Sequence, residues 1–190
     1  GEIDVYAHRA DPEPVMTLPA TTILGTTTVL LVVDAPADGW ARVLLPVRPN
    51  GSTGWISLKD VELSTVPGRI VIELGTRTLT YYENDEARVA TRVGVGTERN
   101  PTPTGTFYVT DSVTLSDANS PWGPAALGLS ARSETITEYN GGDGIIGIHG
   151  TNKPSSIGGA VSLGCIRLAN DVIVQLHELV PLGTPVEIVP

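Results

Sequence analysis

Residues 69–96, RIVIELGTRTLTYYENDEARVATRVGVG, decide the fold class of this chain. They contain three short runs rich in Ile, Val, Thr and Tyr, which the pairs Gly75-Thr76 and Asn84-Asp85 separate. β-Branched and aromatic residues favour strands, and Gly, Asn and Asp favour the turns between them. The stretch therefore predicts the strands of an antiparallel meander in a mostly β fold.

The composition of the whole chain agrees with a folded, strand-rich protein. Of its 190 residues, 41% are hydrophobic and 17% are charged, a balance that separates the chain from disordered sequences. It has 21 glycines and 15 prolines, and it lacks the long Ala-, Glu-, Lys- or Leu-rich runs that favour helices. The length allows one large domain or two small ones.

A linker divides the chain at STVPG, residues 64–68, because Pro67 and Gly68 disfavour the continuation of a strand. We expect a first domain over residues 1–66 and a second domain over residues 67–190. In the first domain, DAPADGWARVLL and PVRPNGSTGWISLKDVEL contain short β-rich runs with Asp-Gly and Asn-Gly turns. These runs predict a small antiparallel barrel or sheet.

Two tryptophans mark strands of the first domain. Trp40 and Trp55 each follow a glycine and begin an apolar run, which resembles the closing strands of bacterial SH3-like (SH3b) domains over roughly Glu2 to Leu63. The resemblance implies a small SH3-like β-barrel. We expect both indoles in a buried core, and the alternative is an exposed platform on which sugar rings stack.

Charge and cysteine content exclude several kinds of partner. The net charge is −9 and no cluster of Lys and Arg occurs, so we expect no nucleic-acid partner. The single cysteine allows no intramolecular disulfide and lacks the paired thiols of common metal sites, so we expect no metal and no cofactor. No apolar run reaches the ~18–20 residues that span a bilayer. We expect a monomer, and we expect any export signal to lie outside this sequence.

Residues 112–144 are turn-rich and weakly patterned, which predicts a long loop of the kind that often forms a functional lid. Trp122 and Tyr139 belong to this region. Their rings are candidates to line the lid over a substrate, or to pin the loop to the sheet.

A helix is expected near the end of the chain. Asn170 or Asp171 can cap its first turn, because their side-chain oxygens accept hydrogen bonds from backbone amides. Apolar residues then recur at the spacing of a helix that packs on a sheet. They are Val172, Leu176, Leu179 and Val180.

The candidate catalytic residues lie in two short motifs. GIIGIHG is an apolar strand that ends next to His149, and SLGCIR places Cys165 on a turn 16 residues later. A thiol attacks an acyl carbon as the thiolate, so a catalytic cysteine needs a nearby base or positive field. Both residues lie at ends of elements, where side chains can converge. We therefore expect His149 to activate Cys165, and a cysteine that only fills a core is the alternative.

Three neighbours of the cysteine have expected roles. Gly164 lets the backbone approach a substrate, and the amides of Gly164 and Cys165 could donate hydrogen bonds to an oxyanion. Arg167 could favour the thiolate or hold a substrate carboxylate, and a surface ion pair is its alternative. Ser162 is expected to shape the turn through hydrogen bonds to the backbone.

These motifs also carry a family resemblance. Residues 148–188, IHGTNKPSSIGGAVSLGCIRLANDVIVQLHELVPLGTPVEI, closely resemble the end of the L,D-transpeptidase (YkuD-type) catalytic domain. NPTPTGTFYV, residues 100–109, resembles the Pro-Thr-Pro-Thr-Gly turn of that family, so the likeness extends over residues 68–190. It implies a β-sandwich-like domain with one or two short helices. It also implies an enzyme that is secreted to the periplasm or the cell wall.

The resemblance implies a reaction on peptidoglycan stem peptides. Cys165 would attack the carbonyl of the third stem residue, release D-alanine and leave a thioester. An amine of another stem would then form a 3→3 cross-link, whereas water would make the enzyme an L,D-carboxypeptidase. His149 would be the base, oriented by the carbonyl of Gly150, and carbapenems would acylate the thiol. Substrate contacts would come from Arg167, Ser162, Trp122 and Tyr139.

One residue departs from the pattern of the family. Leu163 occupies the position where many members have a second histidine, so the substrate contact or hydrogen bond of that group is in question here. His8 lies in the first domain and His177 lies on the expected helix. His149 is therefore the only candidate base.

Two other function classes compete with this interpretation. A papain-like hydrolase also uses Cys and His, but its nucleophile precedes its base in the chain, which is the opposite of the order here. A non-catalytic wall-binding protein would rely on the first domain alone, and the intact Cys, His and Arg set argues against it. We expect the first domain to hold the enzyme on the wall without supplying catalytic groups.

Overall fold

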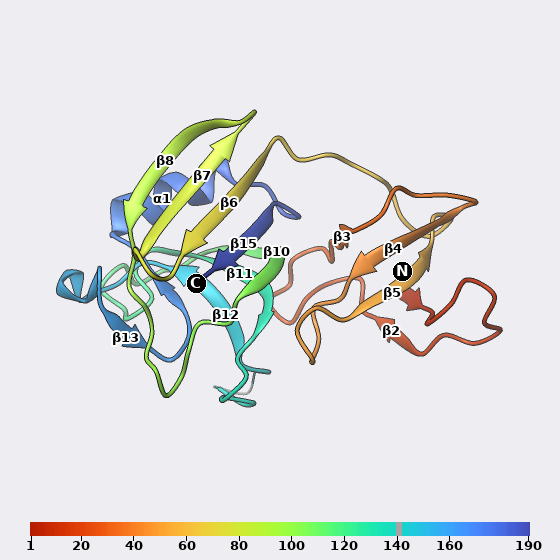
Figure 1. Cartoon of the computed structure of the whole chain (residues 1–190), viewed down its shortest axis with the longest axis horizontal. Coiled ribbons are helices and arrows are strands. Elements are labelled where there is room, and N and C mark those ends of the chain that lie inside the picture. The colour runs from red at the N-terminus through yellow and green to blue at the C-terminus, as the bar shows by residue number, and fades with distance from the viewer. Residues whose placement is uncertain (140–141) are drawn as a thin grey trace.

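The computed structural model describes residues 1–139 and 142–190, which form a small leading region and a larger sheet domain (Figure 1). The leading region has five short strands in two sheets, and a backbone bridge between Tyr6 and Trp55 connects them. The pair is β1 (Ile3–Val5) with β2 (Met16–Leu18), and the antiparallel sheet contains β3 (Leu31–Val32), β4 (Trp40–Leu44) and β5 (Thr53–Ser57).

The tryptophans of the leading region lie on the face opposite its core, so the expectation of two buried indoles is wrong. Trp40 and Trp55 are only half-buried. Trp40 contacts Tyr6 edge to face at a ring-centroid distance of 5.3 Å, and the Arg9 guanidinium lies 4.9 Å from the centre of the Trp55 ring. Side chains alternate along a strand, and the core-facing positions of β4 and β5 include Ala41, Val43, Gly54 and Ile56.

The sheet domain is built on one eight-stranded sheet in the order β14-β12-β11-β10-β15-β6-β7-β8. Its meander, β6 (Gly68–Glu73), β7 (Thr78–Glu83) and β8 (Glu86–Arg92), confirms the strands expected from residues 69–96. A separate pair contains β9 (Val95–Gly96) and β13 (Ala160–Ser162). The other strands are β10 (Gly105–Thr114), β11 (Ala125–Arg132), β12 (Ile145–His149), β14 (Ile166–Arg167) and β15 (Pro185–Val189).

Strand β10 joins the two halves of this curled sheet. Its first part, residues 105–108, pairs with β15, and its second part, residues 109–114, pairs with β11. Ile72 from one half and Leu127 from the other belong to the same fully buried core. This core has no residue in common with the smaller core of the leading region. The expectation of a mostly β fold is confirmed.

Strand β11 corrects the expectation of one long loop over residues 112–144. β11 lies inside the sheet between β10 and β12, and its residues are buried from Ala125 to Ala131. A strand that is buried on both faces shows no alternation of apolar and polar residues. The pattern that reveals a half-exposed strand is therefore missing from its sequence.

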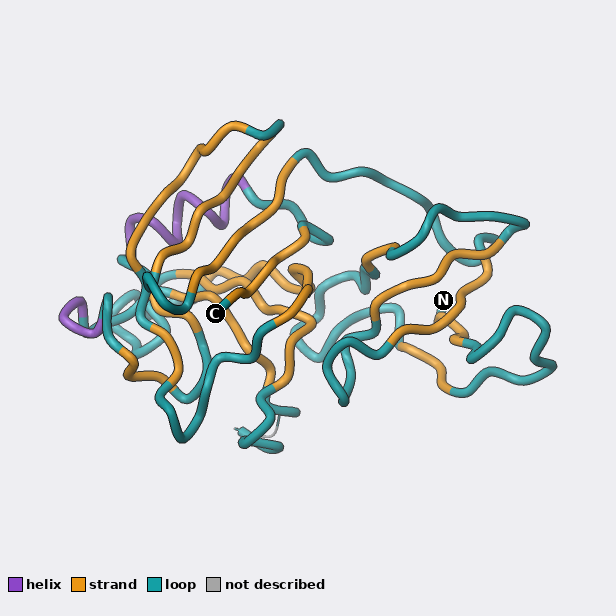
Figure 2. Tube along the Cα trace, viewed as in Figure 1, coloured by secondary structure: helices purple, strands orange, loops and turns teal. Residues whose placement is uncertain are grey.

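The helix α1 (Asn170–Leu179) packs against β11 and β12, and a 3₁₀ turn, η1 (Pro154–Ser156), precedes β13 (Figure 2). Leu176 and Val180 of the expected apolar stripe are buried. The expected cap is wrong, because the N-cap residue is Ala169, whose methyl group accepts no hydrogen bond. Within the described residues, no helix is long and apolar enough to cross a membrane.

Candidate active site

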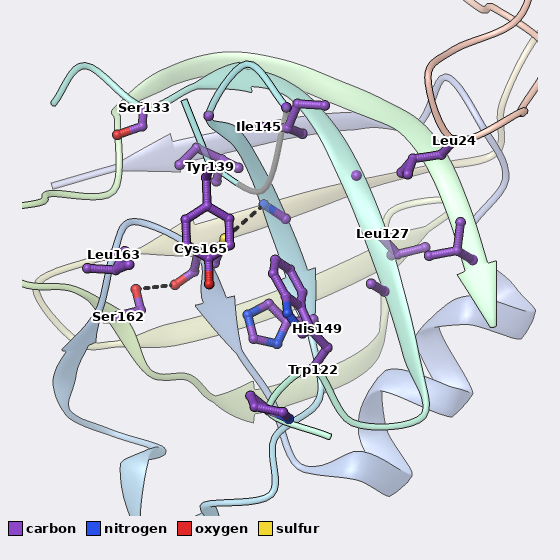
Figure 3. Close-up of a pocket in the computed structure, with 18 of the residues that line it drawn as sticks. Leu24, Trp122, Leu127, Ser133, Tyr139, Ile145, His149, Ser162, Leu163 and Cys165 are labelled. Atoms are coloured by element: carbon purple, nitrogen blue, oxygen red, sulfur yellow. Dashed lines mark hydrogen bonds between the residues drawn. The ribbon is translucent and has the colours of Figure 1, made fainter. Parts of the chain in front are cut away.

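Two adjacent strands position Cys165 and His149. β12 ends at His149, β14 begins directly after Cys165, and the two strands pair in parallel with Ile148 opposite Ile166. The Sγ of Cys165 accepts a hydrogen bond from the Gly147 N–H at 3.4 Å. Both side chains line one cavity (Figure 3). The structure thus brings together the two residues that the sequence motifs singled out.

His149 is held as a neutral imidazole. Its side chain is buried, and burial lowers its pKa to about 4. Its Nδ1 lies 2.6 Å from the carbonyl oxygen of Gly150, and Nδ1 carries the proton because a carbonyl only accepts. The ring of Trp122 packs against the imidazole at a centroid distance of 4.4 Å. The lone pair of Nε2 is therefore available to accept a proton at neutral pH.

Cys165 is also uncharged before it reacts. Burial raises the pKa of its thiol, although the Gly147 N–H and the positive charge of Arg167 act in the opposite direction. A neutral thiol and a neutral imidazole in one cavity differ from a preformed thiolate–imidazolium pair. Nucleophilic attack at this site therefore requires transfer of the thiol proton to a base.

The turn before Cys165 is tightly built. Gly164 has a φ of +121°, and a Cβ atom there would lie 2.8 Å from Cδ1 of Ile146. The Ser162 hydroxyl donates to the Cys165 carbonyl at 2.6 Å and accepts from the Gly164 N–H at 3.1 Å. The Gly164 amide is thus already engaged, which corrects its expected part in an oxyanion hole. The Cys165 amide is the remaining candidate donor.

The same hydrogen bonds define the position of Ser162. Its side chain is 2% exposed, and its hydroxyl is used twice within the turn. This geometry agrees with a residue that shapes the turn, and it argues against direct binding of substrate by the hydroxyl.

Thr102 supports this turn from outside, although sequence analysis did not identify it. Its buried hydroxyl donates to the Gly164 carbonyl at 2.8 Å and accepts from the Gly96 N–H at 2.9 Å. Thr102 belongs to the Pro-Thr-Pro-Thr-Gly motif, which was the one available signal. Nothing local in that motif indicates a partner 62 positions away in the chain.

Asn170 holds the chain that follows His149, and sequence analysis also missed this role. Its Oδ1 accepts a hydrogen bond from the Thr151 N–H at 2.8 Å, and a Cβ atom at Gly150 would collide with it. The side chain that was expected to cap the helix is therefore used to fix this loop. The loop in turn keeps the Gly150 carbonyl beside the imidazole.

Arg167 lies opposite His149 in the pairing of β12 and β14. It lines the cavity, and its charge lowers the pKa of both His149 and Cys165. Within residues 1–139 and 142–190, its Nε is buried without a hydrogen-bond partner and its guanidinium makes no ion pair. The alternative of a surface ion pair is therefore not observed in the described part of the chain.

The cavity has a volume of about 510 Å³, and its lining includes residues that the sequence motifs did not indicate. Trp122, Tyr139 and Leu163 line it, and the last two are nearly half exposed (Figure 3). Ile23 and Leu24 of the leading region also line it. Among the residues that the structure describes, no group of three or more His, Cys, Asp or Glu side chains is placed to hold a metal ion.

Comparison with known proteins identifies close sequence relatives. Residues 67–188 match the family model for the L,D-transpeptidase catalytic domain, YkuD. The chain is 39% identical over 156 residues to the putative L,D-transpeptidase YkuD of Bacillus licheniformis, with 78% of this chain and 86% of the relative covered. It is 38% identical over 124 residues to the putative L,D-transpeptidase YkuD of Bacillus subtilis, with 65% and 67% covered.

A solved structure shows the same fold. The chain superposes on the LD transpeptidase LdtMt1 in complex with imipenem with a TM-score of 0.52 and 18% sequence identity. The match covers 85% of this chain and 100% of that chain. At this level of identity the similarity concerns the fold alone.

Proposed function

The chain belongs to the L,D-transpeptidase (YkuD) family, and from its site we propose that it is a cysteine acyltransferase that cross-links peptidoglycan stem peptides. One observation carries the proposal. Cys165 and His149 face a single cavity from adjacent parallel strands, and the Gly150 carbonyl orients the imidazole so that Nε2 can accept a proton.

The first half-reaction forms a thioester. His149 Nε2 accepts the thiol proton while the Sγ of Cys165 attacks the carbonyl carbon of the third stem residue. The oxyanion of the tetrahedral intermediate accepts a hydrogen bond from the Cys165 amide. The imidazolium then gives its proton to the nitrogen of the terminal D-alanine as the C–N bond breaks. D-Alanine leaves, and the peptide is bound to Cys165.

The second half-reaction transfers the acyl group. An amine from another stem attacks the thioester carbonyl and gives a proton to His149. The C–S bond breaks, and the sulfur regains a proton from the imidazolium. The product is a 3→3 cross-link. Because the buried His149 has a pKa of about 4, its protonated form readily returns the proton in both halves.

Arg167 supplies the positive charge of the site. Its charge favours the thiolate of Cys165, which offsets part of the effect of burial. In the proposed complex its guanidinium also binds a carboxylate of the stem peptide, because such a group fits its planar donors. Trp122 and Tyr139 contact the peptide in the proposed complex, and this assignment is supported by the presence of both residues in the cavity lining.

Mass analysis of the products from purified disaccharide-tetrapeptide tests this function. We expect a cross-linked dimer that has lost one D-alanine, and no product from Cys165→Ala. Tripeptide without dimer would instead assign an L,D-carboxypeptidase. Unchanged substrate with a folded wild-type protein would contradict the enzyme and favour a non-catalytic protein that binds the wall.

We further propose that residues 1–66 form an SH3-like domain and residues 67–190 the catalytic domain. Their two separate hydrophobic cores support this division. Because stem peptides lie outside the cytoplasmic membrane, the proposed location is the periplasm or the cell wall, and the proposed active form is a monomer. Imipenem is expected to acylate Cys165 by opening its strained amide to a thioester.

A further inference from the structure

The leading region presents two exposed aliphatic side chains to the active-site cavity. Ile23 is 73% exposed and Leu24 is 53% exposed, and both line the cavity that contains Cys165. They lie on a turn in which the Gly25 N–H donates to the Thr22 carbonyl at 2.9 Å. Figure 3 shows Leu24 well away from the cysteine turn in the drawn cavity. Apolar surface in this position favours a ligand that covers it.

The turn that carries these side chains is anchored to the sheet domain. The Thr22 hydroxyl donates a hydrogen bond to one carboxylate oxygen of Asp111 on β10. The other oxygen accepts from the Thr110 hydroxyl at 2.7 Å, and Asp111 is buried. A buried carboxylate that lost a partner would destabilise the fold, so this contact is costly to break. The turn therefore keeps a fixed place at the cavity.

A second contact of the leading region supports another part of the lining. The Arg48 guanidinium donates to the carbonyl oxygens of Ser133 at 3.0 Å and Ile136 at 3.1 Å, and it pairs with Asp143. Ser133 and Ile136 line the cavity and lie outside β11 and β12. The leading region therefore also holds in place two lining residues of the sheet domain, Ser133 and Ile136.

The chemistry of the lining differs between its parts. All four titratable residues of the described lining belong to the sheet domain: Tyr139, His149, Cys165 and Arg167. Val113 also lines the cavity. It lies two residues after Asp111, the residue that binds Thr22, and therefore on the same face of β10. A charged group bound among these aliphatic side chains would lose its hydration without a partner. This part of the cavity therefore suits an aliphatic chain.

We propose that the leading region forms a substrate-binding wall, in which Ile23 and Leu24 contact an aliphatic side chain of the stem peptide that Cys165 attacks. The identity of the peptide rests on the proposed function. The leading region thus determines substrate affinity without supplying a catalytic group. Through this substrate-binding wall, the leading region acts at the active site as well as in any attachment to peptidoglycan.

Calorimetric titration of the whole chain with stem tetrapeptide measures the binding affinity and so tests the proposed substrate-binding wall. Cys165→Ala serves as the parent, because it binds peptide without turnover. Leu24→Asp in this parent should weaken binding by roughly tenfold or more, because a carboxylate replaces the apolar contact. Leu24→Met should bind within about threefold of the parent, because the apolar surface is kept. Since Leu24 is exposed, the fold tolerates these changes, and Leu24→Asn provides an uncharged polar variant with the same expected direction.

Leu63→Asp is the matched control. Leu63 is 55% exposed and does not line the cavity, so its substitution should leave the affinity unchanged. Equal affinities of Leu24→Asp and Leu63→Asp would overturn the proposal, as would a parent that binds no tetrapeptide. Turnover by the wild type is measured separately. Binding that depends on Leu24 without any turnover would contradict the proposed function and support the substrate-binding wall.

Discussion

The active-site cavity has a Cys165 part, formed by the sheet domain, and a Leu24 part, to which the leading region contributes Ile23 and Leu24. The two parts are held in place in different ways. Around Cys165, two hydrogen bonds of the Ser162 hydroxyl hold the turn, and Gly164 has a φ of +121°, which residues with a side chain rarely adopt. Leu24 projects from a turn of the leading region that a contact between Thr22 and Asp111 anchors. The difference suggests that the chemistry depends on rigid local geometry, whereas substrate affinity depends on contacts between the two regions.

Adding a methyl group at a glycine in each part tests this difference, and the largest effect is expected at Gly164. Gly164→Ala should lower the rate of Cys165 acylation roughly 10²–10³-fold, because alanine rarely adopts a φ of +121° and the turn that carries the nucleophile must shift. Gly25 also has a positive φ, +82°, but nothing lies within 4 Å of its Cβ position. Gly25→Ala should cost about 1–2 kcal/mol of stability and leave the acylation rate near that of the wild type.

The measurement is the second-order rate of thiol acylation by imipenem, followed by intact mass, with thermal unfolding to show that both variants fold. Equal rates for a folded Gly164→Ala and the wild type would show that the cysteine turn is not rigid. The contrast between the two parts of the cavity would then be lost.

The next effect concerns the buried imidazole. An unfolded histidine has a pKa near ~6.5, whereas His149 in the fold has a pKa of about 4. Between these values the unfolded state binds the proton more tightly, so the free energy of unfolding falls as the pH falls. This group should remove about 3 kcal/mol of stability between pH ~7 and pH ~4.

Urea denaturation of the wild type and His149→Gln at both pH values measures this contribution, because glutamine does not titrate. The loss of stability on acidification should be smaller in the variant by about 3 kcal/mol. An equal loss in both proteins would mean that His149 is not held neutral by burial.

A smaller effect is expected at Thr102, whose hydroxyl supports the turn that carries Cys165. Thr102→Val keeps the shape of the side chain but leaves the Gly96 amide and the Gly164 carbonyl without their partner. We expect a loss of about 1–3 kcal/mol in the free energy of unfolding and a lower kcat, with KM for tetrapeptide little changed. Thr102→Ser restores the hydroxyl and should recover kcat. A change in KM alone would assign Thr102 to substrate binding.

The smallest effect is expected at Leu163, where many relatives have a histidine. Its side chain is 49% exposed, so an imidazole ring can be accommodated. Leu163→His should change the free energy of unfolding by less than about 0.5 kcal/mol. Activity on tetrapeptide should be retained. A folded variant without turnover would show that the site requires an apolar group at this position.

Sequence patterns indicate Cys165 and His149 as candidate site residues because the signals for both residues are local. An apolar strand ends at His149, a glycine precedes Cys165, and both signals survive without knowledge of the fold. The roles of Thr102 and Asn170 are not predictable in this way. Their hydrogen bonds join segments that only the folded sheet brings together.

The Leu24 part carries no such local signal. Ile23 and Leu24 lie in a threonine-rich stretch without a functional motif, and their place at the cavity depends on the partner Asp111, 89 positions away from Thr22. The same limit explains β11, whose burial on both faces removes the alternating pattern. It also applies to Trp40 and Trp55, because a short alternation does not say which face of a sheet is covered.

Intact-mass spectrometry after exposure to imipenem tests the proposed roles of Cys165 as nucleophile and His149 as its base. Because the chain has a single cysteine, one added drug mass should appear on the wild type and none on Cys165→Ala. His149→Ala should react at least roughly 10²-fold more slowly, because the thiol loses the acceptor of its proton. An adduct on Cys165→Ala, or a wild-type rate for His149→Ala, would contradict the assignment.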